Sequence, residues 1–320
     1  MVEINYTLGM STQDPPEIKK QGVVSVRHEM TPVVFKGRLC RVETYWADGA
    51  HYAVLHDVQK QEDISLIVHK KGLNFFSAYC ENDVLYAFAT YVPESREAGG
   101  TCTMFRSEDG INWEEIVLFR RPGWRLFNTS VCKGADGYYM AIEVCSSIIP
   151  GDPLETPEID PVIGHPFTEF FLKSQDLIHW EWLPDDHCLS TERYTACPCL
   201  RYCDEDGYYY IICLLFLPHR RLAPYIYRTK DFYTWEIGLH NPVLMYSKED
   251  RIPKPGAKLP ENQIERIRYH NNINNCDVDL CEFEGKTYIY YLTGDQGGYG
   301  IMCEAIYEGP VNEFLQSFFK

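Results

Sequence analysis

The sequence has little that would form long helices or cross a membrane. No stretch approaches the roughly 20 consecutive apolar residues of a membrane-spanning helix. The first residues, MVEINYTLGMSTQDPPE, have neither the basic nor the apolar region of a secretory signal peptide. Segments with a 3.6-residue apolar period are scarce, and residues 260–270 are the best candidate helix. We therefore expect a cytoplasmic protein built mainly of β-strands.

Clustered basic residues are absent too. Lys and Arg number 30 against 46 Asp and Glu, so the formal net charge is −16. Nucleic acids and anionic membranes are both recognised through clustered Lys and Arg. The charge balance therefore argues against both partners and suits a neutral ligand.

The 13 cysteines lack the pattern of a disulfide framework or a zinc site. Their number is odd, and most lie in apolar, strand-like runs such as YYYIICLLF, residues 208–216. Cys197, Cys199 and Cys203, in CPCLRYC, match no standard zinc-ligand spacing. We interpret these thiols as core side chains of a reduced protein, and the sequence predicts no metal ligand.

The sequence does contain five copies of one predicted arrangement of strands. Each copy has an apolar strand, a tight polar turn and a second strand rich in Tyr, Phe, Ile or Val. The copies are VVFKGRLCRVE from Val33, SAYCENDVLYAFAT from Ser77, SVCKGADGYYMAIEV from Ser130, CLRYCDEDGYYYIICL from Cys199 and DLCEFEGKTYIYYL from Asp279. Repeats of about 40–50 residues with several strands each are typical of β-propellers.

The sequence therefore predicts an all-β fold, a single five-bladed β-propeller domain over residues 1–320. The expected blades are approximately 22–75, 76–118, 125–183, 194–237 and 273–310, and the long insertions are 145–168 and 238–275. Long ordered loops on a rigid scaffold often carry function.

A second motif, Ser/Thr-x-Asp-x-x-x-Trp followed by Glu, tends to close the units. Asp and Ser side chains bond the backbone of tight turns, and the Trp ring is suited to packing between blades. We therefore predict a structural role for the motif and no catalytic role for its aspartates. The three copies are SEDGINW at Ser107, SQDLIHW at Ser174 and TKDFYTW at Thr229, with Asp109, Asp176 and Asp231.

From about residue 22 to the end, these motifs resemble the five-bladed β-propeller glycoside hydrolases of families 43, 32 and 117. The resemblance implies a carbohydrate substrate and a site at the axial funnel, where carboxylates from different blades act as base or nucleophile, acid and pKa modulator. The chain departs from the family 43 pattern at two positions. Thr31 precedes a proline where that family has Asp, and Cys197 precedes Pro198 where it has Glu.

Three acids near expected strand starts are candidates for the base and its modulator, since glycoside hydrolysis needs two carboxyl groups facing across the scissile bond. Glu29 lies just before the first predicted strand of blade one, with His28 beside it as a sugar ligand. Asp277 and Asp279 follow an Asn-rich turn, and two positions apart on a strand they would share one face. We expect Glu29 or Asp277 as base, with Asp279 raising a neighbouring pKa. The alternatives are an exposed acid and a turn-capping pair.

Two further acids are candidates for the general acid. Glu192 lies ahead of the fourth blade, and Glu169 lies between Phe167 and Phe170, where burial would raise its pKa. A surface loop and a solvent-facing strand are the alternatives. The sugar-binding candidates are Asn128, Trp124, Arg193, Tyr194, His165 and Asn275, and Trp46, Phe127 and Tyr299 are further aromatic residues suited to stacking on sugars.

The sequence thus predicts a glycoside hydrolase that acts on a small oligosaccharide or glycoside. One alternative is a glycoside phosphorylase, for which the basic segment at residues 219–221 is the best feature. The other is a propeller that binds carbohydrate without catalysis, which the two departures from the family pattern favour. No cofactor is predicted, although the central channel has room in this scheme for a structural cation.

Overall fold

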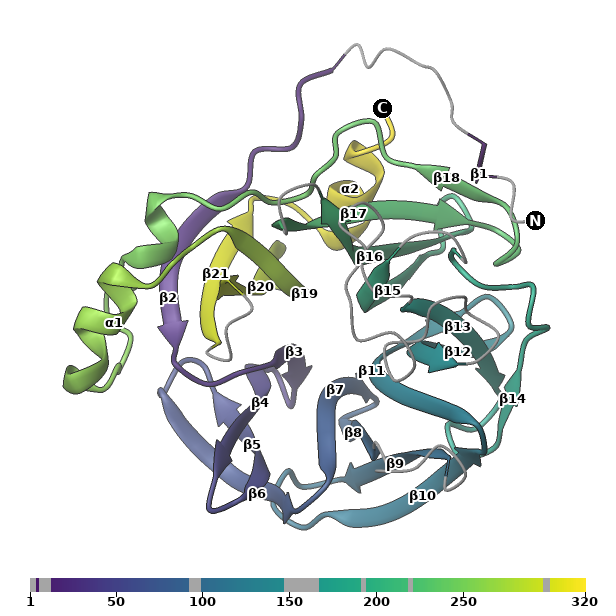
Figure 1. Cartoon of the computed structure of the whole chain (residues 1–320), viewed down its shortest axis with the longest axis horizontal. Coiled ribbons are helices and arrows are strands. Elements are labelled where there is room, and N and C mark those ends of the chain that lie inside the picture. Colours follow the sequence, from purple (N-terminus) through teal and green to yellow (C-terminus); the bar gives the residue numbers. More distant parts are fainter. Residues whose placement is uncertain are drawn as a thin grey trace.

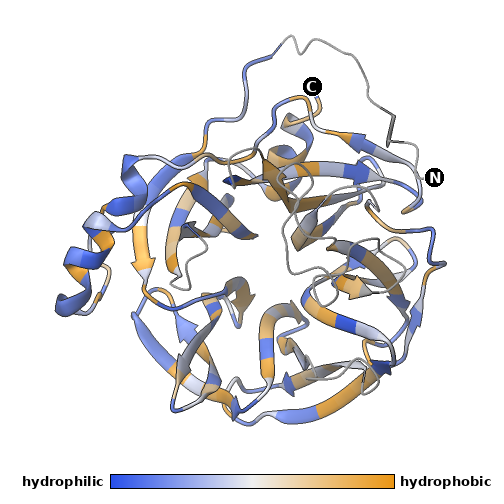
Figure 2. Ribbon diagram, in the orientation of Figure 1, coloured by the Kyte–Doolittle hydropathy of each residue, from blue (hydrophilic) through white to orange (hydrophobic). Residues whose placement is uncertain are grey.

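The computed structural model describes residues 4–5, 13–91, 99–146, 167–190, 194–217, 221–295 and 300–320. Five antiparallel sheets are arranged around a central axis, so the predicted five-bladed β-propeller is confirmed (Figure 1). Each blade begins with its innermost strand and proceeds outward. Hydrophobic residues are concentrated in the strands of the blades (Figure 2).

The first three blades follow the chain in order. Blade one contains β3 (Met30–Phe35), β4 (Arg38–Ala47), β5 (Ala50–Asp57) and β6 (Glu62–Lys70). Blade two contains β7 (Leu73–Glu81), β8 (Val84–Tyr91), β9 (Gly100–Ser107) and β10 (Glu114–Arg121). Blade three contains β11 (Trp124–Gly134), β12 (Gly137–Ser146), β13 (Thr168–Ser174) and β14 (Trp180–Trp182).

The last two blades each recruit a strand from the start of the chain. Blade four contains β15 (Thr195–Cys203), β16 (Tyr208–Leu217), β17 (Arg221–Thr229) and β18 (Trp235–Ile237), with the short β1 (Ile4–Asn5) parallel to β18. Blade five contains β19 (Asn274–Phe283), β20 (Lys286–Gly294), β21 (Ile301–Tyr307) and, outermost, β2 (Lys19–Ser25).

The strand β2 closes the ring, and this differs from the sequence-based division. That division placed residue 22 onward in blade one, whereas β2 pairs antiparallel with β21 of blade five. The pairing covers an edge that blade five would otherwise expose. Gly22 is required there, because its φ is +103° and a Cβ atom would lie 2.3 Å from the Ile252 carbonyl oxygen.

The Ser/Thr-x-Asp-x-x-x-Trp motifs are turns between the two outer strands of a blade. The Asp109 carboxylate accepts the backbone N–H groups of Ile111 and Asn112, both at 2.8 Å. The Trp113 indole N–H donates to Ser65 Oγ of the preceding blade at 3.1 Å. Asp176 and Asp231 make equivalent backbone contacts. The predicted structural role is therefore confirmed.

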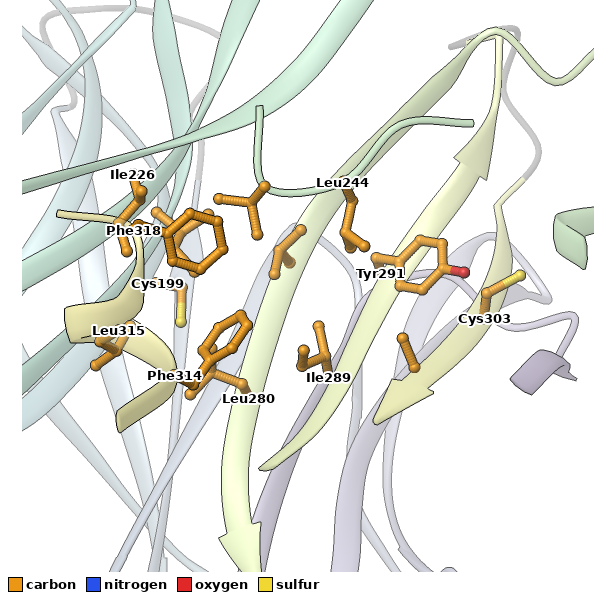
Figure 3. Packing of buried hydrophobic residues seen from close by; sticks show 14 of the residues in the cluster. Cys199, Ile226, Leu244, Leu280, Ile289, Tyr291, Cys303, Phe314, Leu315 and Phe318 are labelled. Carbon is orange, nitrogen blue, oxygen red and sulfur yellow. The ribbon is translucent and has the colours of Figure 1, made fainter. Parts of the chain in front are cut away.

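The core is formed where neighbouring blades pack face to face. Figure 3 shows the cluster between blades four and five, where Leu280 and Ile226 meet Phe314 and Phe318. Phe314 belongs to α2 (Val311–Ser317). Most cysteines are buried, and the described residues contain no disulfide bond.

Besides α2, the helical elements of the described residues lie in the insertion at 238–275, and they are η3 (Lys248–Arg251), η4 (Glu261–Gln263) and α1 (Ile264–Tyr269). They lie at the outer edge of blade five beside β2 (Figure 1). The helix predicted over residues 260–270 corresponds to η4 and α1. Most of the other insertion, 145–168, lies outside the described residues. No described helix has the length and hydrophobicity needed to cross a membrane.

Candidate active site

The innermost strands of blades two to five each carry a β-bulge near their beginning. A bulge leaves two residues opposite one and turns their side chains away from the regular ladder. Three residues in these bulges adopt left-handed φ angles: Phe75 (57°), Cys197 (54°) and Asp277 (47°). The interrupted registers lie between Asn74 and Ser77, Leu126 and Thr129, Ala196 and Cys199, and Cys276 and Asp279.

Blade one has a matching irregularity just ahead of β3. The His28 N–H donates to the Thr44 carbonyl oxygen at 2.8 Å, and the Thr44 N–H donates to the Glu29 carbonyl oxygen at 3.1 Å. Both contacts extend the pairing of β3 with β4 by two residues. Glu29 therefore occupies in blade one the place that the bulged residues occupy in the others.

These five irregularities surround one axial cavity of about 390 Å³. Every blade contributes at least one residue to its wall. The carboxyl groups are those of Glu29, Glu143 and Asp277, the aromatic rings are those of Phe75, Phe127, Phe167 and Tyr194, and the other side chains include His28, Asn128, Cys197, Leu214, Cys276, Leu292 and Thr293.

The pKa values of all three carboxyl groups are raised. Burial, together with the charge of Asp277, raises the pKa of Glu29 to about 8. Burial also raises the pKa of Glu143 to about 7, with Asp277 again adding to the rise. Burial raises the pKa of Asp277, while the nearby thiol of Cys197 opposes the rise. Asp277 thus raises the pKa of both glutamates, as expected for like charges that share a site.

Glu143 was not among the predicted site residues. Its Oε2 accepts the Asn128 side-chain amide at 2.8 Å and the Cys197 N–H at 2.9 Å, so blades three and four jointly orient it. The sequence did contain a signal, since Glu143 is the single acid in the apolar run YYMAIEV. A charged residue inside a buried strand requires partners or a function.

The structure brings together six of the predicted residues. His28, Glu29, Asn128, Tyr194 and Asp277 line the cavity, as does Phe127, one of the aromatic residues predicted to stack on sugars. Burial and the charge of Arg266 lower the pKa of His28, so its imidazole is neutral near pH 7. The catalytic and binding roles given to these residues stay predictions.

Glu169 lies beside the cavity and does not line it. It pairs in register with Glu143 across β12 and β13 and is fully buried. Among the described residues, neither of its carboxylate oxygens has a hydrogen-bond partner. Burial raises its pKa to about 8.

Asp279 lies deeper along the axis. It lines a channel of about 30 Å³ below the cavity, together with Asp277 and Glu29. Its carboxylate pairs with the Arg201 guanidinium and accepts the Leu280 N–H at 2.7 Å. Only Asp277 of the two aspartates also reaches the main cavity.

The remaining candidates lie elsewhere. Asn275 belongs to a buried cluster in which its amide donates to Asp250 at 3.2 Å and its Oδ1 accepts from Lys20 at 3.1 Å. The Trp124 ring packs against Phe170 at 4.6 Å between centroids, in the core of blade three. Neither residue lines the cavity. Glu192, Arg193 and His165 fall outside the described residues.

Within the described ranges, no group of three or more His, Cys, Asp and Glu side chains is arranged to hold a metal ion. Cys199 and Cys203 are buried in the cluster between blades four and five. The channel cation stays a prediction, as does the absence of a cofactor.

Solved structures with the same fold are numerous, although the sequence matches no family model and no curated protein. The chain has the five-bladed β-propeller fold of glycoside hydrolase families 43 and 32. One match is the α-L-arabinanase of Penicillium chrysogenum complexed with arabinobiose, with a TM-score of 0.54 and 12% identity over 88% of this chain and 77% of that one.

A second match to this propeller is a family 43, subfamily 1 enzyme from Xanthomonas citri complexed with xylotriose. Its TM-score is 0.57, with 12% identity over 91% of this chain and 90% of that one. A third is the family 32 β-fructofuranosidase of Bombyx mori, with a TM-score of 0.54 and 11% identity over 89% of this chain and 61% of that one. At these identities the matches establish the propeller fold alone. Any reaction has to be inferred from the residues that line the cavity.

Proposed function

We propose that this protein is a glycoside hydrolase whose active site is the axial cavity. The observation that carries the proposal is the convergence of three carboxyl groups, Glu29, Glu143 and Asp277, from blades one, three and five on one cavity. Paired acids with separated pKa values are what glycoside hydrolysis requires. The arabinobiose and xylotriose bound by two structural neighbours support a carbohydrate ligand.

The three acids differ in how readily they ionise. Asp277 ionises first, because an aspartate is intrinsically the stronger acid and its negative charge then raises the pKa of Glu29 and Glu143. Among the described residues, one backbone donor reaches the Glu29 carboxylate, the Phe76 N–H at 3.2 Å, and it offsets little of the effect of burial. Near neutral pH Glu29 therefore retains its proton.

In the proposed reaction Glu29 protonates the leaving oxygen and Asp277 accepts the proton of the attacking water. Glu143 is held by Asn128 and the Cys197 N–H, and it stabilises positive charge that develops on the sugar ring. Phe75, Phe127, Phe167 and Tyr194 offer apolar faces against which a sugar ring can lie.

A propeller that binds carbohydrate without catalysis is the second candidate. Its support is the thiol of Cys197, which lines the cavity at the position where the resemblance to family 43 implies a glutamate. Burial raises the pKa of this thiol well above its ordinary value, so it exchanges no proton near neutrality. The phosphorylase alternative has less support, because no Arg or Lys is among the described residues that line the cavity.

Product chromatography distinguishes these candidates. The protein is incubated with arabino-, xylo-, galacto- and fructo-oligosaccharides, with and without phosphate. Free monosaccharide in both buffers is the expected result. A sugar phosphate formed only with phosphate would identify a phosphorylase, and protection of the protein from heat by a sugar without turnover would identify a binding protein.

Three conservative variants test the assignment of the acids. We expect Glu29→Gln and Asp277→Asn to lower kcat by about 100- to 10,000-fold with little change in Tm. The wild-type kcat/KM should fall above about pH 8, where Glu29 loses its proton. Glu308→Gln, an exposed acid paired with Lys286, is the control. Full activity in both cavity variants would disprove the assignment.

A further inference from the structure

Trp46 carries an exposed indole ring at the end of blade one where the cavity lies. Trp46 is 54% exposed, although it belongs to the regular strand β4. Most other tryptophans of the chain pack against core clusters. Single exposed apolar side chains are common on protein surfaces, so the position of Trp46 relative to the cavity is what distinguishes it.

The backbone ties Trp46 to the cavity. Thr44 bonds to His28 and Glu29, which both line the cavity wall, and Trp46 follows two residues later on the same strand. Two residues of extended chain span about 7 Å. The innermost strand β3 starts at the cavity, so the β4–β5 turn at residues 48–49 lies at the same end of the blade.

The ring is held in place by its neighbours. The Trp46 and His51 rings meet edge to face, with centroids 4.7 Å apart and an interplanar angle of 75°. On the opposite face of the sheet, Tyr45 of β4 lies on Tyr52 of β5 at 4.9 Å, and Tyr52 lies on His69 of β6 at 3.8 Å. The contact with His51 limits the conformational freedom that the indole ring has to lose on binding.

We propose that Trp46 is a second sugar-binding site, which stacks on the ring adjacent to the one bound in the cavity. The ligand class is therefore an oligosaccharide with at least two linked rings. The C–H groups on one face of a sugar ring are apolar and complement the negative face of an indole. The inference rests on the proposed function, because the cavity holds the first ring.

The histidine ring that contacts Trp46 is linked electrostatically to the cavity wall. Burial and the neighbouring His28 hold the pKa of His51 below its ordinary value, so the ring beneath the indole is uncharged near pH 7. His28, whose charge acts on His51, lines the cavity wall.

The test compares Trp46→Ala, Trp46→Phe and a control, Tyr233→Ala. Tyr233 is 39% exposed and also contacts a histidine ring, that of His187 at 5.4 Å. It lies in the β17–β18 turn, at the end of blade four away from the cavity. Each variant is assayed on the arabino- and xylo-oligosaccharide series, and binding to arrayed mono-, di- and trisaccharides is measured in parallel.

We expect Trp46→Ala to raise KM for di- and trisaccharides about tenfold with kcat retained, which is the size of one aromatic contact. The inhibition constant of the released monosaccharide should not change. Trp46→Phe should restore most of the affinity, and Tyr233→Ala should match wild type.

The outcomes separate this inference from the proposed function. Turnover with an unchanged KM in Trp46→Ala overturns the second site and leaves the hydrolase standing. Absent turnover with oligosaccharide binding that Trp46→Ala loses overturns the hydrolase and supports the site. Neither turnover nor binding by the wild-type protein overturns both.

Discussion

Two glutamates that face each other across adjacent strands differ in the hydrogen bonds that they accept and in their access to the cavity. Glu143 and Glu169 are register partners, and both are buried. Glu143 accepts two hydrogen bonds and lines the cavity, whereas Glu169 accepts none from the described residues. Burial raises the pKa of Glu143 to about 7 and that of Glu169 to about 8. Glu143 is therefore the better candidate for chemistry.

Glu169 makes stability depend on pH. Its pKa is about 8 in the folded state and 4.5 for the ordinary group. Between these values the unfolded chain loses the proton that the folded chain keeps, so the free energy of unfolding falls as pH rises. We expect Glu169→Gln to remove this slope, on the order of 1 kcal/mol per pH unit between pH 5 and pH 8. Urea unfolding at four pH values measures it.

Activity provides a second readout of Glu169→Gln. The structure places Glu169 outside the cavity, so the variant should retain activity once its stability is matched. Loss of turnover in a stable Glu169→Gln would restore Glu169 as the general acid. Unfolding curves that respond to pH in parallel with wild type would contradict its raised pKa.

At the scale of single elements, one end of each blade positions side chains at the cavity, whereas the turns at the opposite end stabilise the fold. The cavity end carries the bulges that aim side chains at the axis. The turns between outer strands at the opposite end carry Asp109, Asp176 and Asp231, whose carboxylates bond backbone N–H groups. Substitutions at the two ends should therefore affect activity and stability respectively.

Asp109→Ala tests this separation. The variant leaves the N–H groups of Ile111 and Asn112 without their acceptor, so we expect a loss of about 1–2 kcal/mol in the free energy of unfolding. The proposed glycosidase activity should be unchanged below Tm. The neighbouring Glu108→Ala, at a 69% exposed side chain, is the control and should have almost no effect. An inactive but stable Asp109→Ala would contradict the structural assignment.

At the scale of the whole molecule, β2 joins the start of the chain to its last blade. Lys20 on β2 donates to both oxygens of Asp250 at 2.9 Å, and Asp250 is fully buried. Tyr291 of β20 donates to the same carboxylate at 2.8 Å. This cluster binds the closing strand, the insertion and blade five together, so it stabilises the closed ring.

Lys20→Met should destabilise the pairing that closes the ring. The substitution leaves the buried Asp250 carboxylate without its counter-ion, which costs about 3–5 kcal/mol. The loss should be smaller in Lys20→Met/Asp250→Asn, because no buried charge remains. Chemical unfolding of both variants, with exposed Lys19→Met as control, gives the comparison. Equal losses in the single and double variants would show that the ion pair does not hold the ring.

Local patterns in the sequence were sufficient for the architecture. Five strand pairs with their turn residues, and motifs such as Ser107–Asp109–Trp113, are short-range features, and they predict five blades and structural turns. Strand-end positions also led to Glu29, His28, Asn128, Tyr194 and Asp277, which do line one cavity.

Features that depend on distant parts of the chain were decided only by the tertiary structure. Ring closure by β2 pairs residues 19–25 with residues 302–306, and no local pattern predicts that contact. Glu143 is held at the cavity wall by the Asn128 amide of its own blade and by the Cys197 N–H of the next blade. Asp279 and Asn275 each lie two positions from Asp277 in the sequence, yet they are held by Arg201 and Asp250 respectively. Sequence spacing places a side chain on its strand, whereas the contacts between blades decide which side chains reach the axis.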